Sequence, residues 1–123
     1  MVVVHHNLNM SREDFFELLK NNNGIIILKF GATWCKPCKL AEPHIEARLK
    51  NLDDRVVYIT IDVDDAFDLY GFLMTKKMVN GIPAVLAYVK GNTSFASDLA
   101  VMGCKETEIN AFFDQVTAKL NAL

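Results

Sequence analysis

The chain has 123 residues, of which 51% are hydrophobic and 23% are charged, and its formal net charge is -2 at pH 7. This length and composition predict a single domain over residues 1–123 and exclude an intrinsically disordered chain. The balanced charge argues against binding along a nucleic-acid backbone, and no apolar run approaches the roughly 20 residues that a membrane-spanning helix needs.

The first third of the chain predicts a helix followed by a buried strand. Ser11 and Asp14 form a capping pattern ahead of apolar residues at helical spacing, and the segment 21–24 ends this helix. The run Ile25–Phe30 is apolar at every position except Lys29. Such a run is typical of a central strand that helices cover on both faces.

The middle of the chain predicts a second helix, a strand and a third helix. The second helix is expected from Trp34 to Lys50 with a kink at Pro43, and the strand from Arg55 to Ile61. Asp64 or Asp65 is expected to cap the third helix. The residues that we expect to pack this helix into the core are Phe67, Tyr70, Leu73 and Met74.

The last part of the chain predicts a hairpin and a final helix. Gly81-Ile82-Pro83 precedes a strand over Ala84–Val89, Gly91-Asn92 forms a turn, and a second strand lies near Leu99–Met102. The final helix is expected from Glu106 to Leu120. Alternating strands and helices, then a hairpin and a helix, predict an α/β fold with a central mixed β-sheet flanked by helices on both faces.

The motif Trp34–Lys39 (WCKPCK) places two cysteines at the start of a helix, directly after a predicted central strand. The helix dipole and its free amide groups favour thiolate over thiol at Cys35. The effect on the thiolate fraction is large. A cysteine with a pKa of about 8.5 is only slightly ionised at pH 7, whereas a cysteine with a pKa of about 7 is half ionised. We therefore expect Cys35 to be the exposed nucleophile and Cys38, one turn deeper, to be the resolving thiol. Pro37 fixes the backbone of the first turn.

Residues from about 8 to 121 resemble a thioredoxin. The motif Trp34–Lys39, then Pro43, Gly81-Ile82-Pro83 and the hairpin at Gly91 follow one another in that family's order. The resemblance implies the thioredoxin fold and the activity of a protein-disulfide reductase with a redox-active disulfide. It also implies a role in electron transport and cell redox homeostasis.

The resemblance further implies a docking surface for disulfide-containing protein substrates. In the family, the peptide bond before the proline of the Ile82-Pro83 pair is cis, and the neighbouring backbone pairs with an extended substrate segment. Trp34 is expected to lie beside it as an exposed residue, and Gly103 to complete the surface.

The expected reaction is thiol–disulfide exchange. The Cys35 thiolate attacks a substrate disulfide, a mixed disulfide forms, and Cys38 then attacks Cys35 to release the reduced substrate. The resemblance implies that thioredoxin reductase, an external NADPH-dependent flavin enzyme, reduces the pair again. The chain has neither a G-x-G-x-x-G motif nor a P-loop, so it is expected to bind no cofactor itself.

Lys29 departs from the family pattern, because thioredoxins usually carry a buried acid at this place on the strand. We expect Lys29 to face the buried side of Cys38 and, with Lys36 on the exposed side, to stabilise the thiolate. A stabilised thiolate predicts a reduction potential above the roughly -270 mV of thioredoxin, towards the roughly -180 mV of protein disulfide isomerase. The alternative is that Lys29 extends to an edge and leaves the thiols unaffected.

Cys104 is a candidate regulatory thiol in the docking region, and the alternative is a small residue that fills the entry to the final helix. The third cysteine and the three histidines show no paired spacing for a metal, so no metal site is expected. Two rival functions stay open. One is an adaptor with the thioredoxin shape but no redox turnover, and the other is a more oxidising disulfide oxidase or isomerase.

The cellular setting is predicted from the thiols and from the start of the chain. Three cysteines are too few for a secreted domain that disulfides hold together, and the first residues lack the pattern of a secretory signal. We therefore expect the reducing cytoplasm. We also expect a monomer with no nucleic-acid or membrane partner.

Overall fold

A β-sheet with the strand order β1-β3-β2-β4-β5 forms the centre of the computed structural model, which describes residues 1–6 and 9–123. Its strands are β1 (Val3–His6), β2 (Ile25–Gly31), β3 (Val56–Asp62), β4 (Ala84–Val89) and β5 (Leu99–Met102). β1 and β2 pair with β3 in parallel, whereas β4 is antiparallel to both β2 and β5. The predicted sheet of mixed direction is therefore confirmed.

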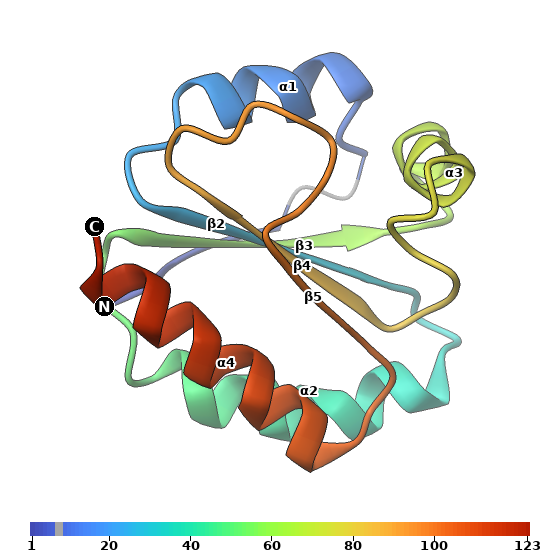
Figure 1. Cartoon of the computed structure of the whole chain (residues 1–123). Helices are drawn as coiled ribbons and strands as arrows, with labels where there is room; N and C mark the ends of the chain where they lie inside the picture. The colour runs from blue at the N-terminus through green and yellow to red at the C-terminus, as the bar shows by residue number, and fades with distance from the viewer. Residues whose placement is uncertain (7–8) are drawn as a thin grey trace.

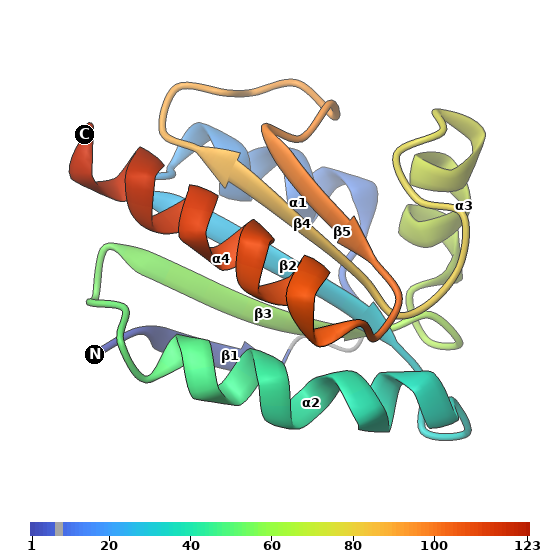
Figure 2. The same cartoon turned by 60° about the horizontal axis from the view of Figure 1, so that its bottom comes forward.

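Four helices of the described chain cover the two faces of this sheet, as Figure 1 shows. They are α1 (Arg12–Lys20), α2 (Lys36–Leu49), α3 (Phe67–Thr75) and α4 (Glu106–Asn121). α1 and α3 lie on one face, and α2 and α4 lie side by side on the other (Figures 1 and 2). This arrangement confirms the predicted α/β layers. In residues 1–6 and 9–123, no helix combines the length and the apolar character needed to cross a membrane.

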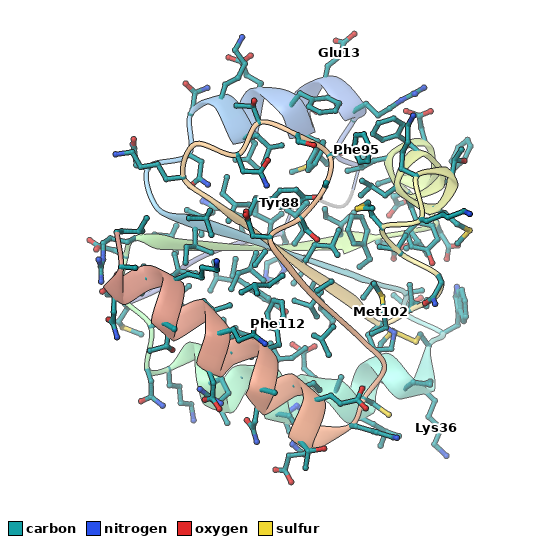
Figure 3. The ribbon with its side chains drawn as sticks, in the orientation of Figure 1. Glu13, Lys36, Tyr88, Phe95, Met102 and Phe112 are labelled. Carbon is teal, nitrogen blue, oxygen red and sulfur yellow. A yellow bond between two sulfur atoms is a disulfide. The ribbon has the colours of Figure 1, made fainter. Side chains whose placement is uncertain are left out.

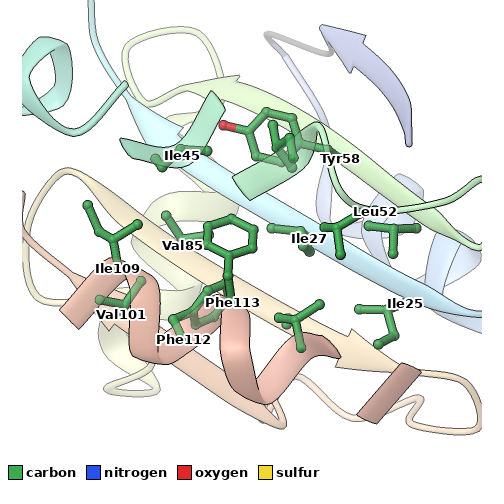
Figure 4. Close-up of a cluster of buried hydrophobic side chains, with 14 of the residues drawn as sticks. Ile25, Ile27, Ile45, Leu52, Tyr58, Val85, Val101, Ile109, Phe112 and Phe113 are labelled. Carbon is green, nitrogen blue, oxygen red and sulfur yellow. The ribbon is translucent and has the colours of Figure 1, made fainter. Parts of the chain in front are cut away.

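The core is divided by the sheet into two apolar clusters. Figure 4 shows the cluster beneath α2 and α4, in which Ile27 and Val85 from the sheet meet Phe113 from α4. The second cluster lies beneath α1 and α3 and includes Leu28 and Tyr88. The strand β2 contributes alternate residues to both clusters and is buried along its whole length. It is therefore the most firmly held strand of the sheet.

The helix termini follow local sequence rules at α1 and α2. The Ser11 side chain accepts the Asp14 amide N–H at 3.0 Å, and the Asp14 carboxylate accepts the Ser11 amide N–H at 3.3 Å, which completes the predicted capping box. Cys35 is the N-cap of α2, Pro37 lies in its first turn, and the helix continues past Pro43 to its last residue, Leu49.

The start of α3 differs from the prediction. Its N-cap is Ala66, without a side-chain hydrogen bond, so neither Asp64 nor Asp65 caps the helix. The Asp62 carbonyl instead accepts the amide N–H groups of Asp65 and Ala66 at 3.2 and 2.9 Å. A turn of main-chain hydrogen bonds thus replaces the expected carboxylate cap.

The buried face of α3 also differs from the prediction. Phe67 is 74% exposed and Met74 is 43% exposed, so the expectation that both pack into the core was wrong. Leu69 and Leu73, one turn apart, are fully buried. Because one helical turn spans 3.6 residues, a face centred on these leucines leaves the outer residues Phe67 and Met74 in solvent.

A close backbone approach at Gly24 gives a test of this packing. Gly24 joins α1 to β2, and a Cβ atom there would overlap the Arg55 carbonyl oxygen, which accepts the Ile25 amide N–H at 3.0 Å. We expect Gly24→Ala to lower the free energy of unfolding by about 1–3 kcal/mol, because the two backbones must move apart. Urea denaturation measures this change.

The matched control is Gly71→Ala in α3, where no neighbouring atom lies within 4 Å of the added Cβ. This substitution should stabilise the protein by up to about 1 kcal/mol, because alanine favours the helix. Equal stability of the Gly24→Ala variant and the unmodified protein would contradict the packing described for this turn.

Candidate active site

The two cysteines of the motif lie where β2 leaves the sheet and α2 begins, at one end of the molecule (Figure 2). Cys35 and Cys38 form a disulfide, and their Cα atoms are 5.3 Å apart. This separation falls within the range that is normal for a disulfide. The buried strand before the pair and the helix after it therefore hold the two sulfur atoms together.

Cys35 occupies the N-cap position of α2, as the motif predicted. Its Sγ atom accepts the amide N–H of Cys38 at 3.2 Å. This contact is the hydrogen bond that an N-cap side chain makes, and it places the sulfur at the positive end of the helix dipole. Lys36 points outward into solvent (Figure 3), so its ammonium group adds positive charge on the exposed side.

The exposure of the two cysteines differs from the prediction. Cys35 was expected to be exposed and Cys38 to be buried, but they are only 3% and 4% exposed. The disulfide explains this similarity, because the Cys35 sulfur bonds to Cys38 over the first turn of α2 instead of pointing into solvent. A difference in accessibility between the two sulfur atoms is therefore expected only in the reduced protein.

The segment around Pro83 lies next to the cysteine loop. The Ile82-Pro83 peptide bond is cis, as the resemblance implied. Ala84 pairs with Phe30 in the antiparallel register, so Pro83 lies at the same end of the sheet as the close of β2. The Pro83 carbonyl accepts the amide N–H of Gly103 at 2.9 Å, which brings these two predicted docking residues together.

Trp34 is one of the exposed residues among those predicted to form the site. Its side chain is 67% exposed, which agrees with the expected position beside the nucleophile. The indole Nε1–H donates to the Asp64 carboxylate at 2.7 Å and so fixes the ring at one edge. The hydrogen bond to Asp64 was not expected from the sequence, where this acid was considered only as a helix cap.

A pocket of about 440 Å³ lies beside Cys38 and contains an ion pair. Lys29 from β2 and Glu42 from α2 both line it, and the Lys29 ammonium contacts the Glu42 carboxylate at 2.5 Å. The Lys29 side chain is 11% exposed, so Lys29 lies on the Cys38 side of the sheet and does not extend to an edge. The position of Lys29 beside Cys38 matches the expected one, whereas the Glu42 carboxylate that balances its charge was not expected from the sequence.

Gly31 lines the same pocket and lies beside both the Cys38 sulfur and the Lys29 side chain. A Cβ atom at Gly31 would lie 3.4 Å from the Cys38 sulfur and 3.8 Å from the Lys29 side chain. The thiol and the lysine are therefore neighbours across the last residue of β2.

Cys104 is a free, half-buried thiol. It packs against the apolar cluster beneath α2 and α4, which favours its interpretation as a small residue at the entry to α4. Ile82 is also half-buried and packs against the other cluster. Within residues 1–6 and 9–123, no group of three or more His, Cys, Asp or Glu side chains is arranged to hold a metal ion.

Glu42 is the main residue of the pocket that sequence reasoning missed. It follows Cys38 by one helical turn, and side chains at this spacing lie on the same helix face. A lysine inside a central strand also requires an anionic partner, because burying an unpaired charge is costly. These two signals together would have identified Glu42.

Comparisons with known proteins show which family this chain resembles in sequence. The Thioredoxin family model matches residues 6–115. A thioredoxin of Ophiophagus hannah is 43% identical over 53 residues, which are 43% of this chain and 50% of that protein. A mitochondrial thioredoxin of Mus musculus is 32% identical over 79 residues, which are 64% of this chain and 45% of that protein. The chain thus spans about half the length of these curated relatives.

The solved structures extend the similarity over nearly the whole chain. The thioredoxin of Malassezia sympodialis has a TM-score of 0.68 and 21% sequence identity, and the alignment covers 95% of this chain and 96% of that protein. At this identity the match shows a shared fold. Since the family model covers most of the sequence and the WCKPC motif lies within it, this chain is a member of the thioredoxin family.

Proposed function

We propose that this chain is a thiol–disulfide oxidoreductase that reduces protein disulfides by dithiol exchange through Cys35 and Cys38. The observation that carries this proposal is the disulfide at the start of α2, in which the Cys35 sulfur accepts an amide N–H of the helix. Amide groups and a helix dipole aimed at one sulfur favour its thiolate, which is the reactive form in exchange chemistry. Membership of the thioredoxin family supports the same activity.

The first step consumes the thiolate of the reduced protein. The Cys35 sulfur attacks one sulfur of the substrate disulfide, a new S–S bond forms to the substrate, and the second substrate sulfur leaves with the electron pair and takes up a proton. In the second step, the Cys38 sulfur attacks Cys35. The bond to the substrate breaks, and the substrate leaves fully reduced while Cys35 and Cys38 are oxidised.

The proposed docking surface consists of Trp34, Ile82, Pro83 and Gly103. Exposure of the Trp34 ring and the hydrogen bond between Gly103 and Pro83 support it, because these residues surround the end of β2 that carries the cysteine loop. An extended segment of a substrate protein would lie along the Ile82-Pro83 backbone next to Cys35. This surface would select unfolded or loop segments that present a disulfide.

The proposed electron source is thioredoxin reductase, an external NADPH-dependent flavin enzyme, and the protein itself carries electrons only in its cysteine pair. The proposed setting is the reducing cytoplasm, where the monomeric protein would contribute to redox homeostasis. The low cysteine content and the free thiol of Cys104 support a reducing compartment.

The first test concerns the ionisation of Cys35. In a reduced variant with Cys38→Ser and Cys104→Ser, only Cys35 reacts with iodoacetamide, and the rate follows the thiolate fraction. We expect half-maximal reactivity at about pH 7, compared with about 8.5 for an ordinary cysteine, because the helix terminus stabilises the anion. A midpoint at the ordinary value would exclude the activated nucleophile.

The second test separates a catalyst from an adaptor. With a reporter peptide pair joined by one disulfide, Cys38→Ser should accumulate a mixed disulfide on Cys35, because the resolving thiol is absent. Cys35→Ser should accumulate none. Mass spectrometry under non-reducing conditions detects the species. If a variant lacking both cysteines retained protein partners as well as the unmodified chain does, the adaptor function would be favoured instead.

The third test measures the influence of Lys29 on the cysteine pair. Replacing Lys29 with Met removes a cation next to Cys38 and leaves the Glu42 carboxylate unbalanced, so the thiolate form is disfavoured. The reduction potential should fall, by an amount on the order of 30 mV for each 1.4 kcal/mol of lost stabilisation. Equilibration with glutathione buffers measures it. Lys29→Arg keeps the charge and should change the potential little, whereas an unchanged potential in Lys29→Met would remove Lys29 from redox tuning.

A further inference from the structure

Cys38 faces a chemical difficulty in the second step of the proposed reaction. Its thiol must lose a proton before the sulfur can attack Cys35, and in the disulfide form Cys38 is nearly fully buried, as Cys35 is. Burial disfavours the charged form of a thiol. Cys38 also lies inside the first turn of α2, whereas Cys35 holds the N-cap position with its amide hydrogen bond. A nearby proton acceptor would remove this difficulty.

Glu42 is placed to be that acceptor. It lies one helical turn after Cys38 on α2, and side chains at this spacing have Cβ atoms about 5–6 Å apart. Both residues line the same pocket. The Glu42 side chain is 37% exposed, so a proton that it accepts has a route to solvent.

Lys29 fixes the position of the Glu42 carboxylate. The Lys29 side chain is packed within the sheet and 11% exposed, and its ammonium group contacts one carboxylate oxygen, Oε2. A carboxylate has a second oxygen with its own lone pairs, which stays available to another donor. The ion pair therefore holds Glu42 over the pocket without using all of its acceptor capacity.

Other charged and titratable groups also lie around Glu42. From β3, Tyr58 is buried, and desolvation, reinforced by the Glu42 and Glu46 carboxylates, raises the pKa of its phenol, which keeps it neutral. Also on β3, Asp62 lines the same pocket and its carboxylate accepts the Asp64 amide N–H at 2.8 Å, but it does not share a helix face with Cys38 as Glu42 does. On α2, Lys39 lines the pocket as a cation and offers no acceptor.

We propose that Glu42 accepts the Cys38 proton when the mixed disulfide is resolved, and that Lys29 is the residue that positions Glu42 for this transfer. The inference rests on the proposed function. The S–H bond of Cys38 breaks as the proton moves to Glu42, and the Cys38 sulfur forms a bond to the Cys35 sulfur. The bond between Cys35 and the substrate then breaks, and the substrate sulfur leaves with the electron pair and takes the proton back from Glu42 or from water. The cysteine pair is oxidised and the substrate cysteine is reduced.

The pH dependence of the second step tests this transfer in the unmodified protein. Reduced protein is mixed in single turnover with the reporter peptide disulfide, the reaction is quenched with acid, and the mixed disulfide is quantified by mass spectrometry. With a carboxylate as acceptor, the rate constant for decay of the mixed disulfide should change less than about threefold between pH 6 and 8, since carboxyl groups are ionised throughout this range. Without an acceptor, it should rise about tenfold per pH unit, following the thiolate fraction.

The decisive variant is Glu42→Gln, with Glu46→Gln as the matched control. Glu46 lies on the same helix and carries the same charge, but it is not among the residues that line the pocket. Glu42→Gln should slow decay of the mixed disulfide by about 100-fold at pH 6 and should introduce the steep pH dependence. Glu46→Gln should keep the flat profile. Lys29→Met should reduce the pH-independent rate of mixed-disulfide decay, whereas Lys29→Arg, which keeps the charge, should leave this rate nearly unchanged.

The two steps of the reaction distinguish failure of this inference from failure of the proposed function. If the mixed disulfide forms on Cys35 at the normal rate and Glu42→Gln resolves it with an unchanged rate and pH profile, Glu42 is not the acceptor and the function stands. A steep pH profile in the unmodified protein overturns the inference even if the variant does not fold. If no mixed disulfide forms in the unmodified protein, the proposed function itself fails.

Discussion

The burial of β2 between two helical layers is the constraint on which the site depends. Each residue of this strand contributes to one of the two apolar clusters or to the pocket, so the strand has no freedom to shift along its neighbours. A shift of one residue would exchange the two faces and bring Lys29 into the cluster beneath α1 and α3. The same fixed strand places the cysteine loop at the end of the sheet, where the loop leads directly into α2.

The elements that the sequence predicted well are those whose local and long-range preferences agree. The capping box at Ser11, the buried run after Ile25 and the final helix have strong patterns, and tertiary packing reinforces each of them. The cysteine motif belongs with them, because its position between a strand and a helix is a property of the sequence alone. The prediction and the structure differ where a helix carries more apolar residues than its buried face can hold, as in α3. Phe67 and Leu69 are both hydrophobic, and the rotation of the helix about its own axis determines which of them is buried.

The pocket beside Cys38 was predictable in part. The side of the sheet on which Lys29 lies follows from strand alternation, and its proximity to Cys38 follows from the end of β2. Its partner depends on the rotation of α2 about its own axis, which is set by the burial of Ala41 and Ile45 against the sheet. That rotation turns Glu42 towards the lysine. A charge placed in a core strand was therefore a reliable sign of an unseen partner, but the identity of the partner required the structure.

Gly31 has a consequence for the space near the second cysteine. The absence of a side chain at this last position of β2 leaves room beside the sulfur, the lysine stem and the carboxylate. A Cβ atom there would lie 3.4 Å from the Cys38 sulfur, so a side chain larger than a methyl group would project into the space beside the inner sulfur. The glycine at this strand end thus sets how closely another group can approach the redox centre from the side of the sheet.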